Sequence, residues 1–124
     1  MPFITVTATA GFTPEQKKNL MQRTSDTVVE TLNSPLKSVR VMLHELPQGN
    51  YLSAGQFDVP GVLFEVDLIA GRTEEAKAAL ISKLGKAAHE TTGVPENDVR
   101  VRIKDFPNTD MGMEGGITAK AAGR

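Results

Sequence analysis

The sequence contains no cysteine among its 124 residues, which excludes thiolate nucleophiles, disulfide bonds and cysteine-ligated zinc. Aromatic residues make up only 5% of the chain against 40% hydrophobic residues, so we expect an aliphatic core. Charge of one sign is also lacking, because 14 basic and 15 acidic residues give a net charge of -1. That balance argues against a nucleic acid or an anionic membrane as a partner chosen by bulk electrostatics.

Long hydrophobic runs are absent as well. The chain shows no stretch of 18 apolar residues and no charged-then-apolar leader, so we expect a soluble, cytoplasmic protein. Its length fits a single domain, which at this size buries roughly two-thirds of the surface of the unfolded chain.

The two halves of the chain repeat each other at an offset of 60 residues without a gap. Glu30-Thr31 matches Glu90-Thr91, and Val39-Arg40-Val41 matches Val99-Arg100-Val101. We therefore predict one domain, residues 1–124, made of tandem copies at residues 2–59 and 62–124 with a seam near residues 59–61.

Each copy has the pattern of a strand, a helix and a second strand. Residues 2–8 and 62–68 are rich in β-branched and aliphatic residues, as are the later segments 39–46 and 99–106. Thr13-Pro14-Glu15-Gln16 is typical of a capped helix start, and Asn33 and Gly93 can end the two helices in a left-handed conformation. The predicted buried stripes are Leu20, Met21, Thr24, Val28, Thr31 and Leu32, and Leu80, Ile81, Leu84, Ala87, Ala88 and Thr91.

These units predict an α/β (α+β) fold in which two β-α-β repeats share one four-stranded sheet with both helices on one face. The long helical crossover favours parallel pairing within each unit. The opposite face of the sheet would carry Phe3, Met42, Phe64 and the segment Met111-Gly112-Met113. Such a face needs a cover, and self-association is the simplest one.

Four segments carry a resemblance to a known family: Met1-Pro2-Phe3-Ile4, residues 11–17, residues 35–41 and Gly71-Arg72-Thr73. Through them the chain resembles the tautomerase superfamily, as a fused form of 4-oxalocrotonate tautomerase. The resemblance implies the tautomerase (MIF-like) fold. It also implies a homotrimer, a pseudo-hexamer, because single-copy members assemble as hexamers.

Pro2 is the predicted catalytic residue. Removal of Met1 would leave Pro2 with a free secondary amine, and an α-amino group has a reference pKa near ~8. Burial among apolar side chains or nearby cations disfavours the protonated form, so the amine could act as a general base near neutral pH. The second copy begins at Val62, and Pro60 is a tertiary amide, so each chain would carry one such base. The alternative is that Pro2 only starts an edge strand.

Arg40 and Arg100 occupy matching positions of the two copies. An arginine holds a carboxylate or 2-oxo acid bidentately, so by resemblance Arg40 or Arg100 would bind the 2-oxo and neighbouring carboxylate oxygens. The alternative is that the two arginines pair with Glu45 and Asp105.

Arg72 would by resemblance bind the distal carboxylate of a dicarboxylate, whereas the first copy has Phe12 at that turn. The alternative is a solvated residue at a helix start, where a cation opposes the macrodipole. The family also places an aromatic residue after the second strand. Tyr51 stands there in the first copy and Met111 in the second, which leaves open which copy lines the pocket.

No metal site is predicted. His44 and His89 have no carboxylate pair at ligand spacing, and Gly115-Gly116 is a turn signal too short to cradle a phosphate.

The resemblance implies an isomerase of aromatic catabolism that needs no cofactor and converts 2-hydroxymuconate, or enols such as phenylenolpyruvate, to 2-oxo acids. One alternative is a 3-chloroacrylate-type dehalogenase or hydratase in which Glu114 activates water. That chemistry requires a partner for Arg72 at the position of Ile69, so the alternative ranks below the tautomerase. Another alternative is a trimeric binding protein without catalysis.

Overall fold

The computed structural model describes residues 2–124, so Met1 and its predicted removal lie outside the described residues. Strand β1 (Phe3–Ala8), helix α1 (Pro14–Leu32) and strand β2 (Arg40–Glu45) form the first unit. Strand β5 (Val62–Ile69), helix α2 (Glu74–Thr92) and strand β6 (Val99–Phe106) form the second. A small hairpin that we did not predict, β3 (Leu52–Ser53) with β4 (Gln56–Phe57), precedes the seam.

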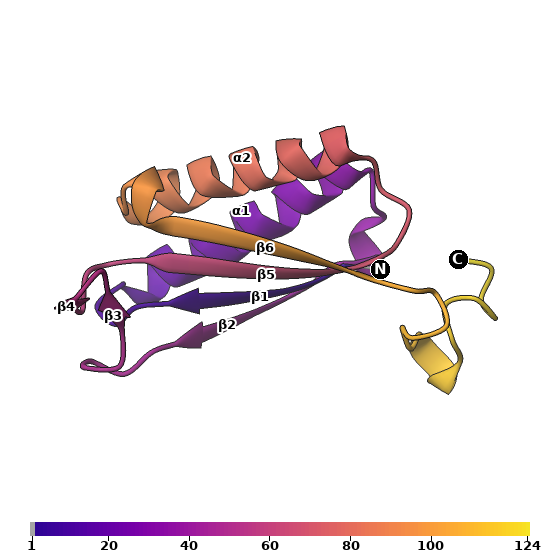
Figure 1. Ribbon diagram of the computed structural model, residues 1–124, viewed down its shortest axis with the longest axis horizontal. Coiled ribbons are helices and arrows are strands. Elements are labelled where there is room, and N and C mark those ends of the chain that lie inside the picture. The colour runs from indigo at the N-terminus through magenta and orange to yellow at the C-terminus, as the bar shows by residue number, and fades with distance from the viewer. Residues whose placement is uncertain (1) are drawn as a thin grey trace.

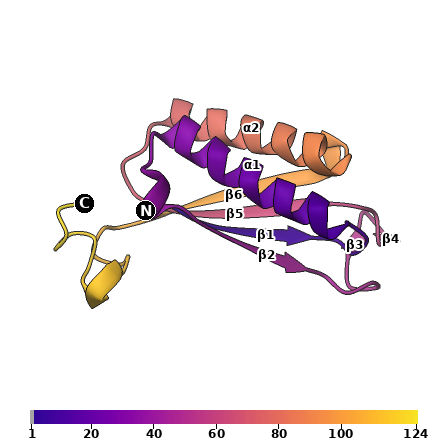
Figure 2. The same ribbon diagram turned by 180° about the vertical axis from the view of Figure 1, so that it is seen from behind.

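The four long strands form one sheet in the order β2-β1-β5-β6. Within each unit the strands pair in parallel, as predicted, and β1 and β5 pair antiparallel at the centre. Both helices lie on one face, and the two views in Figures 1 and 2 show them side by side above the sheet. The fold predicted from the sequence is therefore confirmed.

The helix ends follow the predicted chemistry. The Thr13 hydroxyl accepts from the Gln16 N–H at 3.1 Å, and the Gln16 side chain accepts from the Thr13 N–H at 2.9 Å, which completes a capping box before Pro14. Asn33 ends α1 with φ 53°, and Gly93 ends α2 with φ 79°, where a residue without Cβ is least strained.

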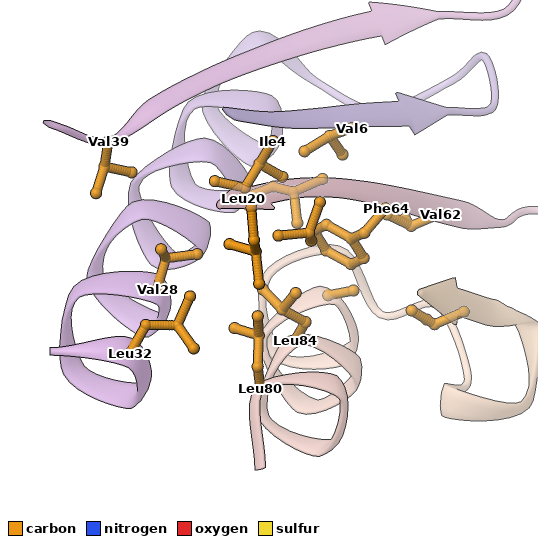
Figure 3. Packing of buried hydrophobic residues seen from close by; sticks show 14 of the residues in the cluster. Ile4, Val6, Leu20, Val28, Leu32, Val39, Val62, Phe64, Leu80 and Leu84 are labelled. Atoms are coloured by element: carbon orange, nitrogen blue, oxygen red, sulfur yellow. The ribbon is translucent and has the colours of Figure 1, made fainter. Parts of the chain in front are cut away.

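The core lies between the sheet and the helices. Alternate residues of β1 and β5 point toward the helices, and Figure 3 shows Phe64 in the cluster that also contains Leu20, Leu80 and Leu84. Two predictions were wrong. Phe64 is 1% exposed and belongs to this core, not to the opposite face. Ile81 is 43% exposed because it lies beside the buried stripe of α2.

The opposite, open face of the sheet keeps Met42 half exposed, whereas Phe3 is partly buried. The C-terminal segment extends beyond the end of the sheet where the chain begins (Figure 1). There Ile69, Met111 and Ala119 form a second buried cluster against which Phe3, Phe106 and Met113 pack. Among the described residues, neither helix has the length and apolar character to cross a bilayer.

Candidate active site

Pro2 lies directly before β1, at the end of the sheet where β5 and β6 finish. Its side chain is buried, and its carbonyl accepts the N–H of Arg40 at 3.2 Å. Phe3 is paired with Arg40 of β2 on one side and with Asp67 of β5 on the other. Phe3 also contacts the Ile69–Met111–Ala119 cluster, so apolar side chains surround the beginning of the chain.

Arg72 reaches the same end of the sheet from the turn between β5 and α2. In Figure 1 this turn lies close to the N-terminus of the chain. The Arg72 Nη2 donates a hydrogen bond to the Ser34 Oγ at 3.2 Å, and Ser34 is 5% exposed. Arg72 is therefore held against the connection between α1 and β2 although it is partly exposed, and its role in binding a distal carboxylate stays a prediction.

Arg40 and Arg100 make matching contacts in the two copies. The Arg40 Nη1 donates to the carbonyls of Lys37 at 2.7 Å and Val39 at 3.2 Å. The Arg100 Nη1 donates to Asn97 at 2.6 Å and Val99 at 3.0 Å.

The predicted alternative, ion pairs of these arginines with Glu45 and Asp105, is wrong. Glu45 binds the Lys17 ammonium at 3.1 Å, and Asp105 binds Lys77. Within residues 2–124 neither arginine has a carboxylate partner. Each guanidinium uses one nitrogen for backbone carbonyls, which leaves donors for a bidentate carboxylate.

Arg100 and Tyr51 lie at the far end of the sheet from Pro2 in the same chain. Arg100 is in register with Leu63, which pairs with Thr7. Thr7 is five residues beyond Pro2 along the chain, which is roughly 17 Å at the usual rise of a strand. A substrate that touches Pro2 therefore cannot reach Arg100 of the same chain.

Tyr51 packs beside the seam. A Cβ on Gly61 would come within 3.3 Å of the Tyr51 ring, so the absence of a side chain at Gly61 makes room for the ring. The Gly61 N–H donates to the Thr9 Oγ1 at 3.0 Å, which ties the seam to the end of β1. In the second copy Met111 corresponds to Tyr51; it is 6% exposed and belongs to the cluster against which Phe3 packs.

The structure thus places Pro2, Arg40 and Arg72 at one end of the sheet, and it places Arg100 and Tyr51 at the other end. Neither Ser34 as a partner of Arg72 nor the burial of Met111 was predicted from the sequence. His89 directs its Nδ1 at the Val94 carbonyl, 2.9 Å away, and no group of three metal-ligating side chains occurs within residues 2–124.

Known proteins resemble this chain in sequence and in overall fold. The Tautomerase family model, described as tautomerase enzyme, matches residues 2–57 and 63–121. The 2-hydroxymuconate tautomerase of Pseudomonas putida is 42% identical over 60 residues, which are 48% of this chain and 94% of that protein.

Among solved structures, Pt0534 inactivated by 2-oxo-3-pentynoate is 59% identical with a TM-score of 0.97, over 98% of this chain and 99% of that one. A fused 4-OT crystallised as a symmetric trimer is 43% identical with a TM-score of 0.95, over 98% and 99%. A member of the cis-3-chloroacrylic acid dehalogenase family, over 94% of this chain and 82% of that one, has a TM-score of 0.85. At 20% identity it shows the fold alone.

The duplicated β-α-β units and the shared sheet define an α+β isomerase of the fused 4-oxalocrotonate tautomerase type. The chain belongs to the tautomerase family, whose enzymes interconvert keto and enol forms.

Proposed function

We propose that this chain is a cofactor-independent tautomerase that uses Pro2 as a general base to convert 2-hydroxymuconate-like enols to 2-oxo-3-enoates, and that also accepts phenylenolpyruvate-type enols. The observation that carries the proposal is the buried Pro2 at the sheet end that also holds Arg40 and Arg72. The Pseudomonas putida relative is named a 2-hydroxymuconate tautomerase, which supports the substrate class.

The proposed reaction is a proton transfer without oxidation or reduction. The Pro2 amine takes the proton of the 2-hydroxyl group, the oxygen electrons form the C2 carbonyl, and the double bonds shift along the chain. The protonated amine then returns the proton to a distant carbon. Burial would disfavour the charged amine and would keep Pro2 available as a base.

The arginines would supply the electrostatic part of catalysis. Arg40 or Arg100 would bind the 2-oxo and adjacent carboxylate oxygens and stabilise the negative charge that develops there. Arg72 would bind the distal carboxylate. Because Arg100 and Tyr51 are far from Pro2 in one chain, we propose that they contribute to a site from a neighbouring protomer.

We further propose that copies 2–59 and 62–124 form one domain and that three chains form a homotrimer. The symmetric trimer of the fused relative supports this assembly. Light scattering should give three times the mass of one chain, and a monomeric, fully active enzyme would contradict the contribution of a neighbour.

The decisive assay follows the ultraviolet absorbance of 2-hydroxymuconate during ketonisation. We expect Pro2→Ala to lower kcat/KM by about 10²–10⁴-fold, the usual contribution of a general base. Pro60→Ala is the matched control, because Pro60 has no free amine, and its rate should stay near that of the parent chain. Intact mass must show loss of Met1. A mass that retains Met1, or unchanged turnover of Pro2→Ala, would overturn the proposal.

A second assay separates the dehalogenase alternative. Glu114 lies exposed in a short turn at residues 114–116, and Ile69, buried against Met111, supplies no second cation beside Arg72. We therefore expect no chloride release from 3-chloroacrylate isomers. Chloride release that Glu114→Gln abolishes would favour the dehalogenase instead, and absence of any turnover would favour a binding protein.

A further inference from the structure

The hydrogen bond between Arg72 and Ser34 joins two segments that are far apart in the sequence. Arg72 follows β5, and Ser34 lies between the end of α1 and β2. The bond is 3.2 Å long, and within the described residues Arg72 forms no ion pair. Ser34 is therefore the polar group that holds this guanidinium in place.

Ser34 itself is firmly placed. Asn33 before it ends α1 in the left-handed conformation, and Pro35 after it begins a short turn in which the Pro35 carbonyl accepts the Ser38 N–H at 2.9 Å. Only 5% of Ser34 is exposed. A hydroxyl held this way can fix one nitrogen of the guanidinium while the others stay free for a ligand.

The other copy has an apolar pair at the same two positions. At the offset of 60 residues, Arg72 corresponds to Phe12 and Ser34 corresponds to Val94. Val94 is 2% exposed and belongs to the main core, against which Phe12 packs. The two copies thus differ at both members of the pair, and the polar pair stands at the end of the sheet that carries Pro2.

We propose that Ser34 is a positioning residue that orients Arg72 toward the distal carboxylate of the substrate, and that it thereby sets the preference of the site for dicarboxylates over monocarboxylates. The proposal rests on the proposed function of Arg72. A free arginine side chain has many rotamers, and a hydrogen bond at one nitrogen preorganises its planar fork for a bidentate carboxylate.

The test compares two unreactive six-carbon dienoates, cis,cis-muconate with two carboxylates and sorbate with one. Ser34→Ala should raise the Kd of muconate roughly ten-fold and leave that of sorbate within about two-fold, since ten-fold corresponds to about 1.4 kcal/mol of lost orientation. Ser34→Thr, which keeps the hydroxyl, should restore muconate binding. Val94→Ser is the matched control in the other copy, and it should leave both constants within about two-fold even if it lowers stability.

Kinetics and a double variant complete the test. For 2-hydroxymuconate, Ser34→Ala should raise KM more than it lowers kcat, and Arg72→Ala should remove the effect of Ser34→Ala in the double variant. Equal weakening of muconate and sorbate, or additive effects of the two substitutions, would overturn the positioning role. The Kd measurements with muconate and sorbate remain decisive if Pro2 proves not to be the base, because binding of these two compounds does not depend on turnover.

Discussion

The leucines at matching positions of the two helices give a quantitative prediction. Leu20 of α1 and Leu80 of α2 are both 0% exposed and belong to the same cluster between helices and sheet (Figure 3). Leu→Ala removes three carbons, which at about 0.8 kcal/mol each amounts to roughly 2.4 kcal/mol of lost transfer free energy. The cavity that remains adds to this, so we expect each substitution to lower the free energy of unfolding by about 3–4 kcal/mol.

Urea unfolding followed by circular dichroism, at one fixed protein concentration, measures both variants. The neighbouring Ile81 is 43% exposed, so Ile81→Ala is the matched control and should cost well under about 1 kcal/mol. Because the two copies share one core, each variant should shift a single transition. Two transitions, one affected by Leu20→Ala and the other by Leu80→Ala, would refute the shared core.

Three further substitutions test a buried hydroxyl group, an ion pair and a strained backbone position. The Thr31 Oγ1 is buried without a hydrogen-bond partner among the described residues, so Thr31→Val should be neutral or stabilising by about 1 kcal/mol in thermal unfolding. A destabilised Thr31→Val would show that the hydroxyl is satisfied. The hydrogen bond and charge of Arg23 lower the pKa of Glu90, so this pair stabilises the fold above the unfolded-state pKa of glutamate and ceases to do so as the pH falls. Arg23→Ala should raise the pKa of Glu90 in an NMR titration, and an unchanged pKa would contradict the pairing. Gly93→Ala should lower stability by about 1 kcal/mol, since φ is 79°, and a neutral result would contradict that strain.

The sequence predicts the helix boundaries and the succession of strand, helix and strand in each copy well because each rests on a local rule. Thr13 and Pro14 start α1, Gly93 ends α2, and the 60-residue offset transfers each assignment to the other copy. Phe64 was misplaced because it stands in a continuous apolar run, Val62-Leu63-Phe64, that does not reveal which residues face the helices. The offset holds that information, since Phe64 corresponds to the buried Ile4 and not to Phe3.

The candidate site was harder to predict than the fold. Pro2 and the arginines can be chosen as candidates from their residue types. Which of them lie at the same end of the sheet, however, depends on the antiparallel pairing of β1 with β5. That pairing places Arg72 beside Ser34 and moves Tyr51 to the far end. Ser34 alone gives no indication of a functional role. Only the comparison with the other copy, where Phe12 and Val94 stand at the positions of Arg72 and Ser34, points to it.

The nitrogen of Pro2 tests the central claim most directly. In protein labelled with ¹⁵N-proline, the Pro2 nitrogen should appear as a titrating secondary amine whose pKa lies below the usual α-amino value near ~8, and kcat/KM should rise with the same pKa. A non-titrating amide nitrogen at this position, or a pKa at or above the usual value, would contradict the account of Pro2 as the base.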